Sequence, residues 1–180
     1  MPTVRAYEPR DRDAVIDIVR TVYKEYGFGW EPDGYHRDIH DIPTYYQGED
    51  AAFWVAELDG KTMGCGGLLT FPTIPGRPHT IVDQDGQFRI SGADCELVRL
   101  YVLPSARRKG LGSALMDQIV GEAKNRGCKR MEIWSDKLLV DAHKMYRRYG
   151  AETLGERLCP PPDETPEWGM GLDLKQDGGA

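Results

Sequence analysis

The sequence predicts an α/β fold in which helices pack on a mixed β-sheet. Apolar runs typical of strands and apolar stripes typical of helices alternate along the chain. No internal repeat or linker interrupts them, and 180 residues suit one domain with a sizeable core. We therefore expect a single domain over residues 3–174, followed by a disordered tail at residues 175–180.

The N-terminal part is expected to form one strand and two helices. The strand covers residues 3–7. A strong helical stripe follows, with Asp11 as its cap and Gly27 as its stop. A weaker helix is expected at residues 35–42, ending before Pro43.

Two hairpins are expected next. Residues 52–58 and 61–71 read as strands joined by Asp59 and Gly60, a strong hairpin signal. The segment 72–92 is too long to be a structureless loop in a compact domain, so we expect an extra hairpin there, with strands at residues 79–82 and 87–90.

The C-terminal half alternates strands and helices and closes with an antiparallel pair. Strands are expected at residues 93–103, 129–134, 151–158 and 167–174, and helices at residues 111–126 and 137–149.

Composition narrows the class of protein. The net charge of −6 disfavours nucleic-acid binding. No signal peptide or membrane-length apolar run is visible, so we expect a cytoplasmic protein without membrane contact. The cysteines are too widely spaced for a zinc or dithiol motif, and we expect reduced thiols and no metal; they are Cys65, Cys95, Cys128 and Cys159.

A strand, a basic turn and a helix follow one another between residues 96 and 113. Pro104 ends the strand, because proline cannot donate to a ladder. A helix N-terminus exposes unpaired N–H groups, and glycine lets an anion approach the backbone. We therefore expect a phosphate-binding loop, with a solvated basic turn as the alternative. Its residues are Arg107, Arg108, Lys109, Gly110, Leu111, Gly112 and Ser113.

This loop is neither a Walker loop nor a three-glycine dinucleotide fingerprint. The pattern Arg107-x-x-Gly110-x-Gly112 behind Leu-Tyr-Val-Leu-Pro resembles the acyl-coenzyme-A loop of the GNAT superfamily of N-acetyltransferases. Ala142, Tyr146 and Gly150 match a second motif of that family. The chain departs from the family at two positions that flank this motif, with Leu139 in place of asparagine and Ala151 in place of phenylalanine.

The resemblance covers almost the whole chain and implies a fold and a reaction. The fold would be a mixed sheet splayed between the fourth and fifth family strands, with helices on both faces and the extra hairpin near residues 72–92. The reaction would be acetyl transfer from acetyl-CoA to an amine by direct attack. Leu100, Tyr101 and Val102 would bind the pantetheine arm, and the backbone amides of residues 107–113 would hold the pyrophosphate.

Two residues are candidates for acid–base chemistry. Glu96 lies on the strand that would line the cleft, and apolar neighbours would raise its pKa so that it could act as base. The alternative is a structural glutamate paired with an arginine such as Arg99. Tyr146, at the spacing of the family's motif, is the candidate acid toward the leaving thiolate. The alternative is a tyrosine packed on the core.

The acceptor is expected to be a small-molecule or peptide amine. Aromatic rings and carboxylates gather in the loop at residues 28–35 and favour a cation; the candidates are Tyr26, Trp30, Glu31 and Tyr35. A hydrophobic staple between two helices is equally compatible with them.

The remaining expectations concern histidines and competing functions. We expect His36 and His40 to be a surface pair rather than a metal site, and His79 and His143 to face solvent. A catalytically silent acyl-CoA-binding or sensing module, or a binder of another phosphorylated ligand, remains an alternative, and a homodimer is compatible with the sequence.

Overall fold

The computed structural model describes residues 1–175, and they divide into two compact units. The first unit comprises residues 1–69, 98–119 and 160–163, and the second comprises the intervening segments and the C-terminal part. Strand β6 (Cys95–Val102) and helix α4 (Leu111–Asn125) contribute residues to both units. One domain over residues 3–174 therefore stays a prediction, and residues 176–180 of the expected tail lie outside the described part.

The strands form a seven-stranded sheet in the order β1-β2-β3-β6-β7-β9-β8. The β6–β7 pair is parallel, whereas β1–β2, β2–β3, β7–β9 and β8–β9 are antiparallel, so the predicted mixed sheet is confirmed. The extra hairpin is also present, as a separate pair of β4 and β5. The bounds are β1 Thr3–Ala6, β2 Ala51–Leu58, β3 Lys61–Thr70, β4 Ile81–Gln84, β5 Gln87–Ile90, β7 Arg130–Asp136, β8 Glu152–Leu158 and β9 Pro166–Asp173.

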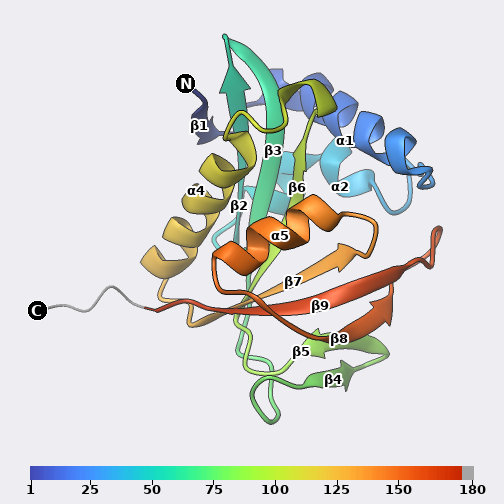
Figure 1. Ribbon diagram of the computed structural model, residues 1–180, viewed down its shortest axis with the longest axis vertical. Coiled ribbons are helices and arrows are strands. Elements are labelled where there is room, and N and C mark those ends of the chain that lie inside the picture. The colour runs from blue at the N-terminus through green and yellow to red at the C-terminus, as the bar shows by residue number, and fades with distance from the viewer. Residues whose placement is uncertain (176–180) are drawn as a thin grey trace, which may run out of the picture. The chain divides into compact units, whose positions relative to one another are not determined.

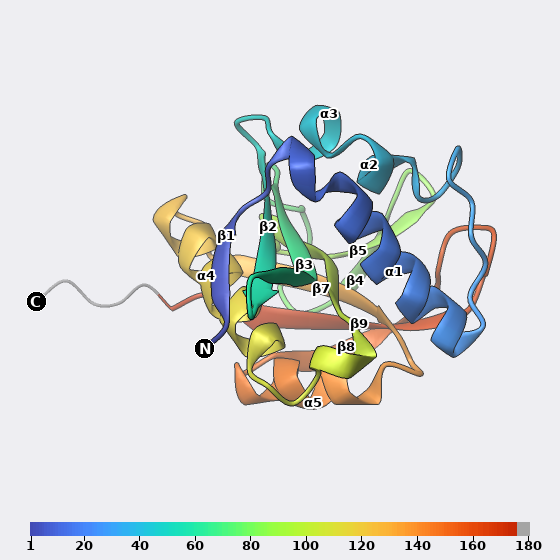
Figure 2. The ribbon, with the colours of Figure 1, turned by 90° about the horizontal axis from the view of Figure 1, so that it is seen from above.

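In the first unit, helices lie on both sides of the strands. Helix α1 (Arg12–Tyr26) lies on one side of β2, β3 and β6, and the first part of α4 lies on the other (Figures 1 and 2). The buried stripe of α1 recurs at helical spacing and packs in one apolar cluster with Phe53 and Val55 of β2. Its buried members are Val15, Ile18, Val19, Val22 and Tyr23.

The expected single helix at residues 35–42 is wrong. The structure has two short helices instead, α2 (Arg37–His40) and α3 (Ile42–Tyr46). Pro43 lies in the first turn of α3, where its missing N–H removes no helical hydrogen bond. The proline therefore begins a helix here rather than ending one.

In the second unit, helix α5 (Val140–Arg148) lies over β7 and β9 (Figure 1). Its His143 Nε2 is 3.0 Å from the Ser135 Oγ of β7. On the other face of the strands, Arg157 of β8 donates to the Phe88 carbonyl of the β4–β5 hairpin at 3.0 Å. The expected solvent-facing His143 is therefore wrong, because this side chain is only 3% exposed; His79 is exposed as expected.

None of the described helices is long and apolar enough to cross a membrane. The longest, α1 and α4, have 15 residues each.

The buried carboxylate of Asp11, the residue directly before α1, ties the start of this helix to β1. Asp11 is 4% exposed and forms a two-pronged ion pair with Arg5 of β1, at 2.6 and 2.7 Å. It also accepts a hydrogen bond from the Glu8 N–H at 2.9 Å. Burial alone would raise the pKa of Asp11, but the hydrogen bonds from Arg5 and from the Glu8 N–H outweigh it and lower the pKa below its ordinary value.

We expect Asp11→Ala to lower the free energy of unfolding by about 2–4 kcal/mol, because it leaves the Arg5 guanidinium and the Glu8 N–H without their partner. A lowered pKa stabilises the fold above the pKa of the unfolded chain, so the difference between wild type and variant should shrink as the pH falls below about 4. Urea unfolding at several pH values measures both effects. Asp13→Ala is the matched control: its contact with Arg12 is 3.5 Å long and exposed, and the change should stay within about 0.5 kcal/mol. Equal losses for the two variants would contradict this account.

Candidate active site

The turn between β6 and α4 has the backbone shape of an anion site. It begins with a single 3₁₀ turn at Pro104–Ala106. Arg108 and Gly110 follow with φ values of 63° and 88°, and alternating backbone handedness of this kind makes neighbouring N–H groups converge. The Ala114 N–H donates to the Gly110 carbonyl at 2.9 Å, which places Gly110 immediately before α4. The first N–H groups of the helix have no intrahelical acceptor and can bind an anion.

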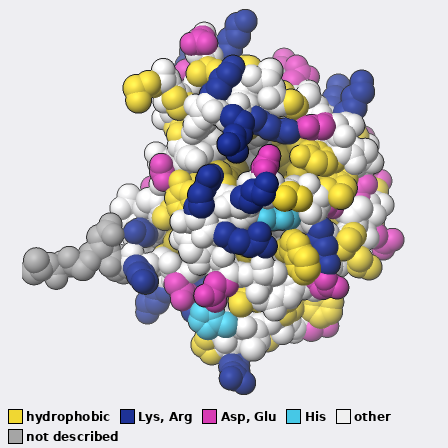
Figure 3. Space-filling view, in the orientation of Figure 1, with side chains coloured by type: hydrophobic (Ala, Val, Ile, Leu, Met, Phe, Trp, Pro, Cys, Tyr) yellow, Lys and Arg dark blue, Asp and Glu magenta, His cyan; other side chains and the backbone are white. Residues whose placement is uncertain are grey.

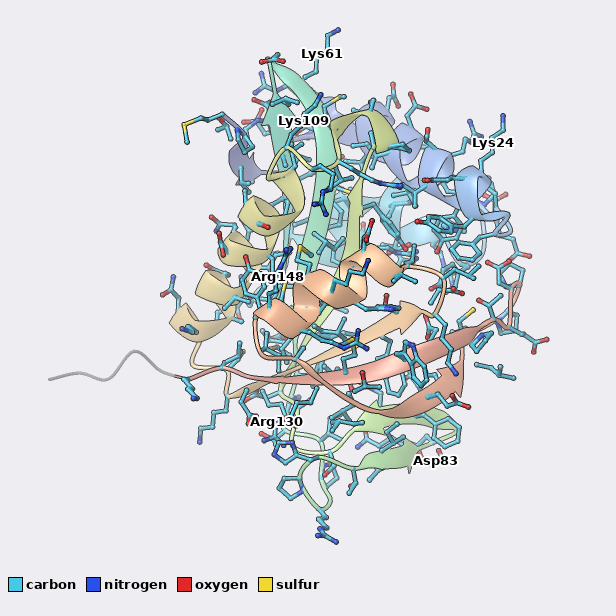
Figure 4. The ribbon with its side chains drawn as sticks, in the orientation of Figure 1. Lys24, Lys61, Asp83, Lys109, Arg130 and Arg148 are labelled. Atoms are coloured by element: carbon cyan, nitrogen blue, oxygen red, sulfur yellow. The ribbon has the colours of Figure 1, made fainter. Side chains whose placement is uncertain are left out.

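The three cations of this turn have different surroundings. Arg107 donates to both carboxylate oxygens of Glu25 in α1, at 2.7 and 2.6 Å, and to the Val102 carbonyl at 3.3 Å. Arg108 and Lys109 are exposed. Lys and Arg side chains gather over this segment in Figure 3, and Figure 4 shows Lys109 extending from it. Arg107 therefore anchors the turn, while Arg108 and Lys109 present their charge to solvent.

The part of β6 expected to bind pantetheine is irregular. Arg99 has φ of 54°, a left-handed conformation that is uncommon for a residue with a side chain. Leu100, Tyr101 and Val102 follow it and are half-buried. The Leu103 N–H that ends this stretch donates to the Met63 carbonyl of β3 at 2.9 Å. The distortion at Arg99 had no signal in the sequence, because arginine does not mark positive φ as glycine does.

The Arg99 side chain is bound to groups of the first unit. Its guanidinium is 10% exposed and contacts both oxygens of Asp38 at 2.8 Å. It also donates to the Tyr35 carbonyl at 2.7 Å and lies 4.7 Å from the Tyr35 ring centre. The partner of Arg99 is therefore Asp38 and not Glu96. An arginine does lie beside Glu96, but it is Arg89, at 3.8 Å.

Glu96 belongs to a cluster of charges in the second unit. The parallel register of β6 and β7 places it directly beside Glu132. Glu132 is fully buried and accepts hydrogen bonds from Arg89 Nε at 2.5 Å, the Ile90 N–H at 2.8 Å and Trp134 Nε1 at 3.3 Å. Glu96 keeps 21% of its side chain exposed and lies 3.8 Å from Arg89 Nη2.

This environment suits a base. Burial, followed by the charge of Glu132, raises the pKa of Glu96 to about 7, against the opposing effect of Arg89 and Arg157. A carboxylate with such a pKa is ionised in part of the molecules at neutral pH and can accept a proton there. Sequence reasoning missed Glu132 and Arg89. The available signal was a glutamate inside the apolar run from Met131 to Trp134.

Tyr146 lies on the buried face of α5. It is 4% exposed and shares this face with His143, three residues earlier. Ala142, which begins the second motif, is half-buried, and Gly150 has the left-handed φ of 97° that a residue after a helix often adopts. The tyrosine is thus held by a rigid element, as the core-packing alternative also requires.

The candidate acceptor residues belong to an aromatic cluster in the first unit. Tyr26 stacks on Phe28 with ring centres 5.7 Å apart, and Trp30 stacks on His36 at 4.3 Å. Tyr35 lies against Arg99, and Glu31 is exposed. These contacts order the loop between α1 and α2, as both acceptor binding and a hydrophobic staple would require.

The expected surface pair of histidines is wrong. His36 is fully buried, and its Nδ1 accepts a hydrogen bond from the Glu31 N–H at 3.1 Å. Burial, followed by the nearby Arg99 charge, lowers the pKa of His36 to about 4, so the ring is neutral at pH 7. In the described residues, His36 Nε2, His40 Nε2 and Trp30 Nε1 are buried without a hydrogen-bond partner. Buried water commonly satisfies such groups.

Three potential metal ligands lie together in the second unit. Ligand atoms of Asp94, Cys95 and Cys128 are within 4.8 Å of one another. The Asp94 carboxylate accepts hydrogen bonds from the N–H groups of Lys129 and Arg130 at 2.9–3.1 Å. Burial raises the pKa of both thiols, which disfavours the thiolate that a metal needs. A structural role for Asp94 explains the cluster.

The sequence is similar to those of several known proteins. The chain is 28% identical over 160 residues to the uncharacterized N-acetyltransferase YjgM of Escherichia coli, covering 87% of this chain and 86% of that protein. It is 29% identical over 142 residues to rat N-acetylaspartate synthetase, covering 78% of this chain but only 40% of that protein.

Solved structures share the fold. An acetyltransferase of the GNAT family from Staphylococcus aureus superposes with a TM-score of 0.75 at 16% identity, covering 97% of this chain and 100% of the other. The model of the acetyltransferase (GNAT) family matches residues 15–151. The match spans both the basic turn before α4 and the motif on α5, and the chain therefore belongs to the GNAT acetyltransferase family.

Proposed function

We propose that the protein transfers an acetyl group from acetyl-CoA to a primary amine of a small molecule, amino acid or peptide, with Glu96 as base and Tyr146 as acid. The observation that carries this proposal is the position of Glu96, which is partly exposed and lies directly beside the buried Glu132. Burial and this like charge raise the pKa of Glu96. A base works best when its pKa lies near the working pH.

The proton balance follows from the chemistry of amines. The acceptor arrives as an ammonium ion, and Glu96 accepts one of its protons, directly or through water. The amine nitrogen then forms a bond to the carbonyl carbon of the thioester that acetyl-CoA supplies, and the C–S bond breaks. Tyr146 donates a proton to the departing thiolate, and the second proton released by the nitrogen returns to the tyrosine oxygen.

The first unit supplies the groups for coenzyme binding. The N–H groups at the start of α4 and the charges of Arg108 and Lys109 suit a pyrophosphate. The strand residues Leu100, Tyr101 and Val102 would pair with the pantetheine amides as a further strand would. Arg107 holds the turn through Glu25 and acts mainly on its shape.

The acceptor class is inferred from the aromatic loop and from relatives. Tyr26, Trp30, Glu31 and Tyr35 would favour a cationic amine. The structural neighbours include a ribosomal-protein-S18-alanine N-acetyltransferase, and the sequence relatives include N-acetylaspartate synthetase. A peptide or amino-acid amine is therefore within the proposed range. We expect the enzyme to act in the cytoplasm without a metal, membrane or nucleic acid, as a monomer or a homodimer.

Coenzyme binding should depend on the turn before α4. We expect the double change Gly110→Asp and Gly112→Asp to abolish acetyl-CoA binding, because two side chains and two negative charges would occupy the anion site. Gly110 also needs its left-handed φ of 88°. Calorimetric titration with acetyl-CoA measures the loss. Gly121→Asp, at an open position later in α4, is the charge control and should bind normally. Unchanged affinity of the double variant would exclude the site.

Glu96→Gln should slow turnover at every pH where the acceptor is protonated and leave acetyl-CoA affinity unchanged. The wild-type kcat/KM should rise with pH through about 7, as Glu96 loses its proton. The variant should lack this rise, because glutamine does not titrate. Profiles measured on one amine decide the matter: a variant with the wild-type profile would show that another group is the base.

Release of free thiol from acetyl-CoA with a panel of amines tests the activity itself. Tyr146→Phe keeps the ring but removes the hydroxyl, and we expect kcat to fall about 100-fold or more without loss of acetyl-CoA binding. Tyr149→Phe, at the residue directly after the same helix, is the matched control and should be close to wild type. A silent binding module would release no thiol with any amine, in the wild type as in the variants.

A further inference from the structure

The inserted β4–β5 hairpin brings one cation to the two carboxylates. Arg89 lies on β5, and its side chain is only 16% exposed. Its guanidinium lies 4.5 Å from the centre of the Phe71 ring, which holds the group from one face. Nε contacts Glu132 Oε1, while Nη2 contacts Glu132 Oε1 and lies 3.8 Å from Glu96 Oε2. A single planar group therefore reaches both acids.

The two acids need such a group, because they are neighbours on adjacent strands. Glu96 and Glu132 are directly paired in the parallel register, with side chains on the same face of the sheet. Two carboxylates at this spacing repel each other, and one takes up a proton unless a cation compensates. The second hairpin contact, from the Ile90 N–H to Glu132 Oε2, fixes the remaining oxygen.

The other charges around Glu96 are already paired. Arg157 of β8 donates to Glu167 of β9 at 2.8 Å and lies 4.0 Å from the centre of the Trp134 ring. Its Nη1 is bound to the Phe88 carbonyl. Arg157 and Glu167 act on Glu96 through their charges with opposite signs. Arg89 is thus the cation that Glu96 and Glu132 share by direct approach.

We propose that Arg89 is a positioning residue of the reaction: the inserted hairpin uses its guanidinium to hold Glu96 beside Glu132 and so keeps Glu96 available as the base. Glu132 acts as the anchor, because it is saturated with donors and closed to solvent. The proposal rests on the proposed role of Glu96. It gives the hairpin a task in proton transfer rather than in acceptor binding.

The test compares the pH dependence of kcat/KM in variants that should shift it in opposite directions. The acid limb is the part of this profile where kcat/KM rises as Glu96 loses its proton. Arg89→Gln removes the cation, so the acid limb of kcat/KM should move to higher pH by about one unit. Glu132→Gln removes the like charge, so the limb should move to lower pH by a similar amount. The double variant should lie between the two. Arg89→Lys keeps the charge but not the planar fork, and its limb should lie closer to wild type than that of Arg89→Gln.

Two controls keep the outcome interpretable. Arg130→Gln removes an arginine of the same unit whose partners are Asp173 and His79, and its acid limb should not move. Carboxyl carbon NMR of labelled glutamate, titrated in wild type and variants, follows Glu96 without any turnover, and circular dichroism verifies folding. If Arg89→Gln is unstable, the double variant replaces the buried unpaired charge by a neutral amide, and its NMR titration compared with that of Glu132→Gln gives the effect of Arg89.

The outcomes separate this proposal from the proposed function. Opposite shifts in the single variants, in both turnover and NMR, support Arg89 as the positioning residue. An acid limb that vanishes in Glu96→Gln but stays in place in Arg89→Gln and Glu132→Gln overturns the role of Arg89 and retains the base. A limb that persists in Glu96→Gln overturns both.

Discussion

The burial of one carboxylate organises the second unit. Glu132 is fully buried among the apolar residues between Met131 and Trp134, and an uncompensated charge there would cost several kcal/mol. Its donors come from β5, through Arg89 and the Ile90 N–H, and from Trp134 on its own strand. The hairpin and β7 are therefore tied by charge as well as by the small apolar cluster around Ile74, Ile90 and Ala93.

Strand β6 carries two charged side chains, Glu96 and Arg99, in different electrostatic environments. Near its start, Glu96 lies beside the like charge of Glu132 and close to Arg89, and its pKa is raised to about 7. Further along, Arg99 is neutralised by Asp38, whose Oδ2 also accepts a hydrogen bond from the Tyr46 hydroxyl at 2.5 Å. The ion pair of Arg99 is largely buried, whereas Glu96, the proposed base, keeps 21% of its side chain exposed. Arg99 also has a left-handed φ of 54°.

The order of elements was predictable because hydrophobic periodicity and turn residues are local signals. Nearly every strand and helix was placed within a few residues, including the inserted hairpin. The features that could not be predicted depend on tertiary contacts. Pro43 could end a helix or begin one, and only the packing of Ile39 and Ile42 decides that it begins α3. The burial of His143 has no local signal, because its hydrogen-bond partner, Ser135, lies on a different element. Arg89 and Glu132 are 43 residues apart, and no local pattern connects them.

The charge cluster of the second unit is costly to bury, and the proposed function gives a reason for it. Burying Arg89, Glu96, Glu132, Arg157 and Glu167 together requires desolvation of five charges, and apolar residues of similar volume often stabilise a fold as well or better. Stability alone therefore does not account for the cluster, whereas the proposed role of Glu96 as base would. Within it, Glu132 is saturated with donors and closed, while Glu96 keeps 21% of its side chain exposed and has the shifted pKa. Of the two acids, the proposed base is the one that the rest of the cluster leaves partly uncovered.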